Sequence, residues 1–183
     1  LNRARVRVEI EWLIALCHEG VAGTTPLPVD TITALRGVVE HFGPSHLEII
    51  AGYEATTRHD VKAVEYFVRD VLSEQGLDSL AELVHFGCTS EDINNVSYAL
   101  VTQGAMSEVF TPAFSQLQQS LKNLAQQWRD EPMLSRTHGQ PATPTTMGKE
   151  IAVFAHRLTG IAGRLEAIPY LAKFSGATGT FSA

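Results

Sequence analysis

The sequence predicts an all-α fold, an elongated helical bundle with two long heptad-like helices. Two apolar repeats in steps of three and four support this prediction, as do the capping residues and glycine stops elsewhere in the chain. Helix length is the third observation. Residues 90–129 would span about 60 Å as one helix, whereas a compact chain of this size is about 40 Å across. We therefore expect these helices to form part of an oligomeric central bundle that other chains complete.

Residues 1–88 predict a series of shorter helices that form an N-terminal helical domain. The expected helical segments are residues 3–18, 30–43, 45–57, 60–73 and 78–84. Asp30 should cap the second segment, and Ser45 with Glu48 should form a capping box at the third. Residues 89–183 then form the first part of a long-helix bundle domain.

The first long repeat follows a capping box formed by Thr89 and Asp92. Nine of the eleven positions in the repeat are apolar, and the positions are Ile93, Val96, Leu100, Gln103, Ser107, Phe110, Phe114, Leu117, Leu121, Leu124 and Trp128. This spacing is typical of a coiled-coil seam rather than of a loose amphipathic stripe. Pro112 should kink the helix without ending the pattern.

A second repeat predicts the other long helix. Thr143 should cap this helix, and Pro144 should take its first helical position. Its apolar positions are Met147, Ile151, Phe154, Leu158, Ile161, Leu165, Ile168 and Ala172. Between the two repeats we expect at most a short strand pair, near residues 133–137 or 142.

The composition excludes several classes of function. A formal net charge of −6 argues against a nucleic-acid-binding surface, and no apolar run approaches the ~20 residues that span a bilayer. Cys17 and Cys88 make no disulfide framework, which favours reduced thiols in a cytoplasmic protein. The chain begins within an expected helix and ends in a Gly-rich loop, so we expect it to be part of a longer protein.

Three polar segments interrupt the helical pattern, and the first places Arg58, His59 and Lys62 at an expected helix start. Cationic side chains together with the open backbone N–H groups of such a start favour an anion. The alternative is a solvated helix cap with Asp60 as the N-cap residue.

The other two segments combine hydroxyl, imidazole and turn-forming residues. Thr89 and Ser90 lie beside first-turn amides that would bind a carboxylate or phosphate, unless Thr89 only caps its own helix. Gly139 and Pro141 fix the backbone around His138, between the two long helices. An imidazole with a pKa of about 6.5 suits proton transfer at neutral pH, and a purely structural role for this segment is the alternative.

Motifs for metals and dinucleotides do not occur in the sequence. Its seven histidines include no H-E-x-x-H motif and no pair at ligand spacing. The segment 176–179 lacks the G-x-G-x-x-G pattern, and no expected strand precedes it. We therefore expect neither a metal nor a cofactor.

The three polar segments read T-T-R-H-D-V-K-A-V-E-Y, H-F-G-C-T-S-E-D-I-N-N and S-R-T-H-G-Q-P-A-T-P. In this order they resemble the adenylosuccinate lyase family, within the fumarase and aspartase superfamily. The third segment alone is similar to the whole superfamily, and the first narrows the resemblance to adenylosuccinate lyases of a bacterial branch. That branch often has Asn where Arg58 stands, whereas other branches have Arg.

The resemblance implies a homotetrameric lyase of purine nucleotide biosynthesis whose active sites are shared between subunits. Such an enzyme eliminates fumarate from adenylosuccinate to give AMP, and from the ribotide SAICAR to give AICAR, by acid–base β-elimination. By this resemblance His138 is the catalytic acid. The substrate-binding residues that it implies are Arg58, His59, Asp60, Thr89 and Ser90.

The resemblance also implies a catalytic serine on a flexible loop of the Ser-Ser-x-Met-Pro-x-Lys-x-Asn-Pro type, and no such segment occurs in this sequence. We therefore expect the chain to be inactive by itself. Two alternatives stay open. One is a non-catalytic helical oligomerisation module that keeps the family sequence, and the other is a different lyase of the superfamily, such as argininosuccinate lyase.

Overall fold

The computed structural model describes residues 1–181 and is mostly helical, at 69%. It divides into two compact units. The first unit is Leu1–Thr102 together with the chain end from Leu171, and the second unit is Gln103–Tyr170. The predicted all-α class is confirmed, whereas the predicted domain boundary between residues 88 and 89 stays a prediction.

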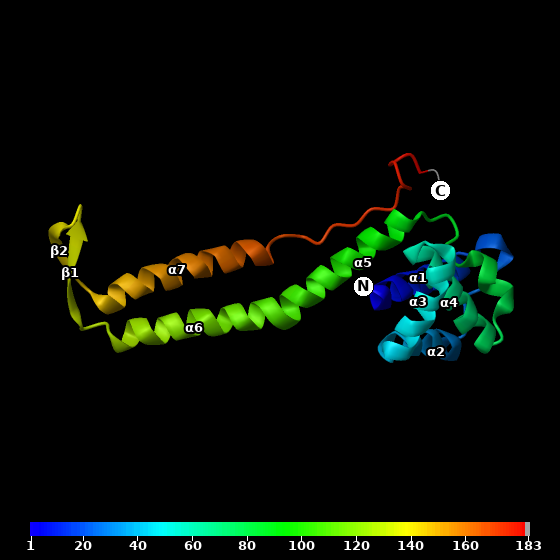
Figure 1. Cartoon of the computed structure of the whole chain (residues 1–183), viewed down its shortest axis with the longest axis horizontal. Coiled ribbons are helices and arrows are strands. Elements are labelled where there is room, and N and C mark those ends of the chain that lie inside the picture. The colour runs from blue at the N-terminus through cyan, green and yellow to red at the C-terminus, as the bar shows by residue number, and fades with distance from the viewer. Residues whose placement is uncertain (182–183) are drawn as a thin grey trace. The chain divides into compact units, whose positions relative to one another are not determined.

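In the described part of the chain, four α-helices and two 3-10 turns form the body of the first unit (Figure 1). Their bounds are α1 Asn2–His18, η1 Val21–Gly23, α2 Val29–Glu40, α3 Pro44–Thr57, α4 Asp60–Glu74 and η2 Asp78–Leu83. Helix α1 packs on α2 and α4, and α3 packs on α4. Val61, Val64 and Leu72 are fully buried, because residues three and four apart share one helix face.

Two helix starts in this unit differ from the prediction. The expected capping residues Asp30 and Ser45 both lie inside a first turn, and Pro28 is the N-cap residue of α2. At α3, the Gly43 amide donates a hydrogen bond to the Nδ1 of His46 at 3.0 Å. Each start lies beside a proline, whose fixed φ suits the first residues of a helix.

The first predicted long helix is confirmed as a helical run of 38 residues. It comprises α5 Ser90–Ala105, the π-helical turn η3 Met106–Phe110 and α6 Thr111–Gln127. Pro112 has no amide hydrogen, so the Glu108 carbonyl loses its usual helical donor, and the backbone widens just before the proline. The helical pattern continues past Pro112, as predicted.

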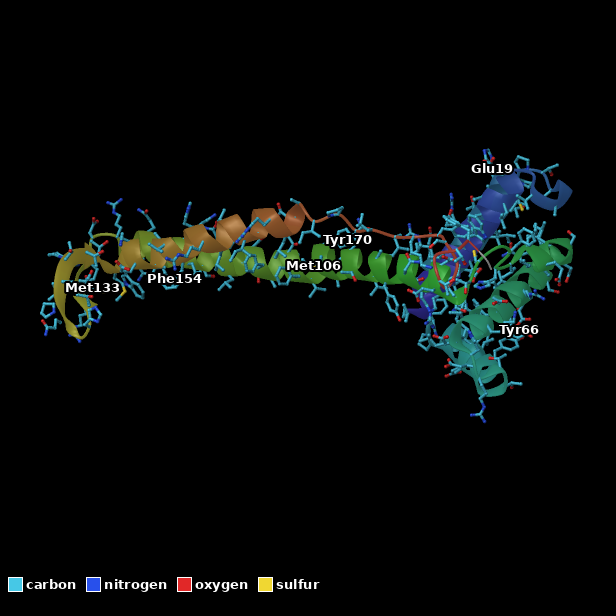
Figure 2. The ribbon with its side chains drawn as sticks, turned by 90° about the horizontal axis from the view of Figure 1, so that it is seen from above. Glu19, Tyr66, Met106, Met133, Phe154 and Tyr170 are labelled. Atoms are coloured by element: carbon cyan, nitrogen blue, oxygen red, sulfur yellow. The ribbon has the colours of Figure 1, made fainter. Side chains whose placement is uncertain are left out.

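The second unit is a helix, a β-hairpin and a returning helix. Strands β1 (Pro132–Thr137) and β2 (Gln140–Thr146) pair in antiparallel fashion, and α7 (Met147–Glu166) packs along α6. Two views show these helices side by side, with the hairpin at the end that joins them (Figure 1; Figure 2). Gly148 permits this approach, because a Cβ there would lie 2.6 Å from the backbone nitrogen of Arg129.

The hairpin is longer than predicted, and it shifts the start of α7. Thr143 and Pro144 belong to β2, so the prediction that they begin the helix is wrong. A proline is tolerated in this strand because both strands of a two-stranded sheet are edge strands. Thr146 is the N-cap residue instead, and its Oγ1 accepts the Lys149 amide at 3.2 Å.

Helix α7 ends at Glu166, although the predicted repeat continued through Ile168 to Ala172. Pro169 accounts for the difference. A proline disfavours helical geometry in the residue before it and supplies no amide hydrogen of its own. The residues from Leu171 onward belong to the first unit.

Candidate active site

The starts of α4 and α5 lie together in the first unit and bring most of the predicted site residues into one place. The set at the two helix starts is Arg58, His59, Asp60, Thr89 and Ser90. The Oγ of Ser90 lies 3.4 Å from the Nε2 of His59, although the two residues are 31 positions apart in the sequence. The first two polar segments of the sequence therefore form one candidate site.

His59 both caps α4 and faces Ser90. Its Nδ1 accepts the Lys62 amide at 3.2 Å, so the alternative with Asp60 as the N-cap residue is wrong. Because Nδ1 accepts a hydrogen bond, the proton of the neutral ring is assigned to Nε2, the nitrogen near Ser90. The His59 side chain is 51% exposed, which leaves this nitrogen within reach of a bound molecule.

Asp60 is held by a buried cation. The Arg5 side chain is only 6% exposed, and its Nη2 donates to the Oδ2 of Asp60 at 2.5 Å. The Arg5 Nε donates to the Oδ1 of Asn94 at 2.9 Å. Arg5 therefore joins α1 to the starts of both α4 and α5. Burial alone would raise the pKa of Asp60, but the Val61 amide and Arg5 together lower it below its ordinary value. Asp60 is thus an anion, and Arg5 ties it to the start of α5.

Arg58 ends α3 in the left-handed conformation, with a φ of 55°. Positive φ is uncommon for a residue other than glycine. Its amide donates to the Glu54 carbonyl at 2.8 Å, which closes the last turn of the helix. The side chain is exposed, and within residues 1–181 its guanidinium has no hydrogen bond or ion pair. A cation is therefore available beside His59 for an anionic ligand.

A cluster of ionisable groups extends from the first turns of α4 and was not predicted. The Nζ of Lys62 lies 2.6 Å from the Oε2 of Glu65, whose Oε1 lies 3.8 Å from the Nε2 of His85. The Nδ1 of His85 lies 2.7 Å from the Oε1 of Glu9. Glu9 is fully buried, and among the described residues its Oε2 has no hydrogen-bond partner. The candidate site thus adjoins a buried ionic cluster.

The pKa values of His85 and Glu9 in this cluster are both shifted. Burial alone would lower the pKa of His85, but its hydrogen bond with Glu9 and the charges of Glu9 and Glu65 raise it above the ordinary value. Burial raises the pKa of Glu9, against the effect of His85. One sequence signal could have indicated the cluster. Glu9 is a charged residue among the apolar positions of α1.

His138 lies at the turn of the hairpin in the second unit. Thr137 pairs with Gln140, so His138 and Gly139 form a two-residue turn. Their φ angles are 50° and 76°, as the twist of such hairpins requires. The His138 side chain is exposed and, in the described part of the chain, forms no hydrogen bond. The expected loop is thus a tight β-turn, and the catalytic role of His138 stays a prediction.

Two further observations on residues 1–181 concern metals and membranes. Among residues 1–181, no three His, Cys, Asp or Glu side chains lie close enough to hold a metal ion. Over the same residues, no helix has both the length and the apolar character needed to cross a membrane.

Sequence comparison places the chain in a family of enzymes. A family model described as lyase matches residues 4–183, and the chain belongs to this lyase family. Within the family it is similar to adenylosuccinate lyases. It is 44% identical over 185 residues to the adenylosuccinate lyase of Escherichia coli (strain K12), and 41% identical over 191 residues to that of Dictyostelium discoideum. Each match covers 100% of this chain and 41% of the relative.

Solved structures show the same fold. The fumarate lyase from Mesorhizobium sp. BNC1 matches with a TM-score of 0.76 at 23% identity, covering 98% of this chain and 40% of that one. The 3-carboxy-cis,cis-muconate lactonizing enzyme from Pseudomonas putida matches with a TM-score of 0.70 at 23% identity, over 98% and 40% of the two chains. The expected fumarase-type fold is therefore confirmed. The chain spans 41% of the length of the curated relatives named above.

Proposed function

We propose that the full-length protein is an adenylosuccinate lyase, which eliminates fumarate from adenylosuccinate to give AMP and from SAICAR to give AICAR. The observation that carries the proposal is the meeting of the α4 and α5 starts, where Ser90 lies 3.4 Å from His59. Similarity to adenylosuccinate lyases along the whole chain, at 44% identity for the Escherichia coli protein, supports the choice of substrate.

The two helix starts offer what a phosphorylated dicarboxylate needs. Open first-turn amides and the positive end of the helix dipole favour anions at α5, and the hydroxyls of Thr89 and Ser90 add donors. Arg58 contributes an exposed guanidinium, and His59 contributes the Nε2 hydrogen. In this proposal these four residues bind the anionic groups of the substrate. Asp60 belongs to the same substrate-binding group, and its Oδ1 lies 3.7 Å from the Nδ1 of His59.

The proposed elimination requires two proton transfers. A base removes a proton from the carbon next to a carboxylate, the bond between carbon and the purine amine breaks, and an acid protonates the departing amine. His138 is the proposed acid, because its imidazole is exposed and histidine is the side chain most often used for proton transfer. The base is expected in the remainder of the protein, on the serine loop that the resemblance implies.

Exposed apolar side chains in the second unit support a homotetramer with shared sites. Val109, Leu117 and Phe154 are 68%, 49% and 59% exposed. Apolar surface of this kind along long helices indicates contact with other chains. If each site takes residues from different subunits, a mixture of two inactive variants, His138→Ala and one that lacks the serine of the expected flexible loop, should recover part of the activity.

The test is an elimination assay on the full-length protein, with fumarate release measured from adenylosuccinate and, as a control, from argininosuccinate. Release from adenylosuccinate alone supports the proposal. Release from argininosuccinate alone would favour the other lyase. No release from either substrate, together with no thermal stabilisation by AMP or fumarate, would favour a non-catalytic oligomerisation module.

A further inference from the structure

The Asp92 carboxylate is buried in the first unit and is surrounded by hydrogen-bond donors. Only 1% of its side chain is exposed. Its Oδ2 accepts the Thr89 amide at 3.0 Å, and its Oδ1 accepts the Ser175 amide at 2.9 Å. The Gly176 amide lies 3.2 Å from both oxygens, and the Nζ of Lys173 lies 3.0 Å from Oδ1.

This arrangement suits an ionised carboxylate and no other side chain of the same shape. A carboxylate is an acceptor only, and each hydrogen-bond partner of Asp92 among residues 1–181 is a donor. An isosteric amide would turn N–H groups toward other N–H groups. Burial alone would raise the pKa of Asp92, but the amides of Ser175 and Thr89 and the Lys173 ammonium lower it below its ordinary value.

Asn95, one turn further along α5, holds the same returning segment. Its Oδ1 accepts the Lys173 amide at 2.7 Å, and its Nδ2 donates to the Lys173 carbonyl at 3.0 Å. The Phe174 ring packs on Trp12 with 4.9 Å between ring centroids. The segment 173–176 is therefore fixed across the first turns of α5, within one compact unit.

We propose that Asp92 is a positioning residue, which fixes the turn carrying Thr89 and Ser90 against the segment 173–176 and so holds the Ser90 hydroxyl beside His59. A simple helix cap would need only the Thr89 amide. The other donors to Asp92 come from residues 81 to 84 positions away in the sequence. One carboxylate thus sets the place of two chain segments at once. The structural part of this inference is independent of the proposed function, and its kinetic consequence depends on it.

The structural part is tested by hydrogen exchange in the full-length protein. Asp92→Asn should speed exchange of the Thr89, Ser175 and Gly176 amides by at least about tenfold, because these amides lose a charged acceptor. Leu35→Ala is the control, since Leu35 is a fully buried residue of α2 and should leave these three amides unchanged relative to the rest of the unit. Unchanged exchange at Ser175 and Gly176 in Asp92→Asn would overturn the proposal. If that variant does not fold, Lys173→Met replaces it, because it removes one bond between the segment 173–176 and the carboxylate. Exchange of the Ser175 and Gly176 amides should then speed up while that of the Thr89 amide stays unchanged, and no change at Ser175 and Gly176 would overturn the proposal.

The kinetic part is tested by coupling between two substitutions. We expect Ser90→Ala to lower kcat/KM about tenfold in the wild-type background, and less than about twofold in Asp92→Asn, because a displaced hydroxyl no longer contributes. In the Leu35→Ala background, the Ser90→Ala effect should stay about tenfold. Equal losses in all three backgrounds, or no loss from Ser90→Ala in the wild type, would contradict a positioning role. If the wild-type protein releases no fumarate, only the proposed function fails, and the exchange measurement still decides the structural part.

Discussion

The two units of the chain bury apolar surface to very different extents. In the first unit, Ile10, Leu13 and Leu35 are completely buried in one core. Of residues 103–170, all of which the structure describes, only Gly148 and Ala155 are buried. Most of the positions of both long apolar repeats lie in this second unit. A repeat in steps of three and four therefore predicts a helix, but it does not show what that helix packs against.

The same difference separates the two groups of candidate site residues. The α4 and α5 starts depend on a packed interior, because buried Arg5 and Asp92 fix them in place. His138 lies on an exposed turn and supports no core. Substitutions in the first unit should therefore change both the stability and the activity of the protein, whereas a substitution of His138 should change its activity alone.

The largest effect is expected from His138→Ala in the full-length protein. The kcat should fall by at least about 10²-fold, because the proposed donor of a proton to the leaving amine is lost. The Tm should change little, since the side chain is exposed. His156→Ala, which removes another exposed histidine of the second unit, is the matched control and should keep its kcat. A near-normal kcat for His138→Ala would assign the turn a structural role only.

His85→Gln should lower the free energy of unfolding by about 3 kcal/mol at pH 6, because a broken buried ion pair leaves Glu9 without a cationic partner. The folded-state pKa of His85 is raised. This stabilisation is therefore complete below the ordinary pKa of about 6.5, and it is lost as the pH rises through the folded-state value. Urea unfolding from pH 6 to pH 9 should show the wild type and the variant converging. A difference that widens with pH would contradict the ion pair.

Gly148→Ala should destabilise the helix pair of the second unit by about 1–3 kcal/mol. The added Cβ would clash with the backbone of Arg129 and with the Ala125 carbonyl. Gly160→Ala in the same helix is the control, since a Cβ there meets nothing within 4 Å and should stabilise the helix by up to about 1 kcal/mol. Thermal denaturation compares the two variants. If both change the Tm alike, α6 and α7 do not approach closely at Gly148.

The smallest effect is expected from His59→Ala, which should raise KM about tenfold with a lesser change in kcat, because the proposed donor to an anionic group of the substrate is lost. Loss of the helix cap should also lower stability by about 1 kcal/mol. His18→Ala, at the exposed end of α1, should leave KM unchanged. Steady-state kinetics on adenylosuccinate would show this. An unaltered KM for His59→Ala would remove His59 from the binding site.

The long helices could be predicted because a three-four repeat marks one helix face over many turns. Their starts could not be placed as well, because the residues there suit more than one structure. Thr143 and Pro144 fit a helix start by local preference, yet they also fit an edge strand, and pairing with β1 decides between the two. Pro169, by contrast, indicates from the sequence alone that α7 ends before it.

The candidate site, like the long helices, could be predicted only in part from the sequence. Polar residues such as Arg58 and Ser90 interrupt an apolar pattern, and such breaks are visible in a sequence. Glu9 and His85 could not be paired from the sequence, because the two residues are 76 positions apart. Whether a charged residue is buried depends on the partner that folding brings to it.

At position 138 the residue type that suits the backbone of the hairpin turn differs from the residue type that can transfer a proton. Two-residue turns with positive φ at both positions favour Asn-Gly or Asp-Gly, and here a histidine occupies the first position with a φ of 50°. An asparagine at position 138 would suit this backbone better, but an amide does not exchange a proton near neutral pH. A substitution at position 138 that stabilises the turn would therefore remove the proposed proton donor, so a more stable hairpin would be accompanied by a lower rate of the proposed reaction.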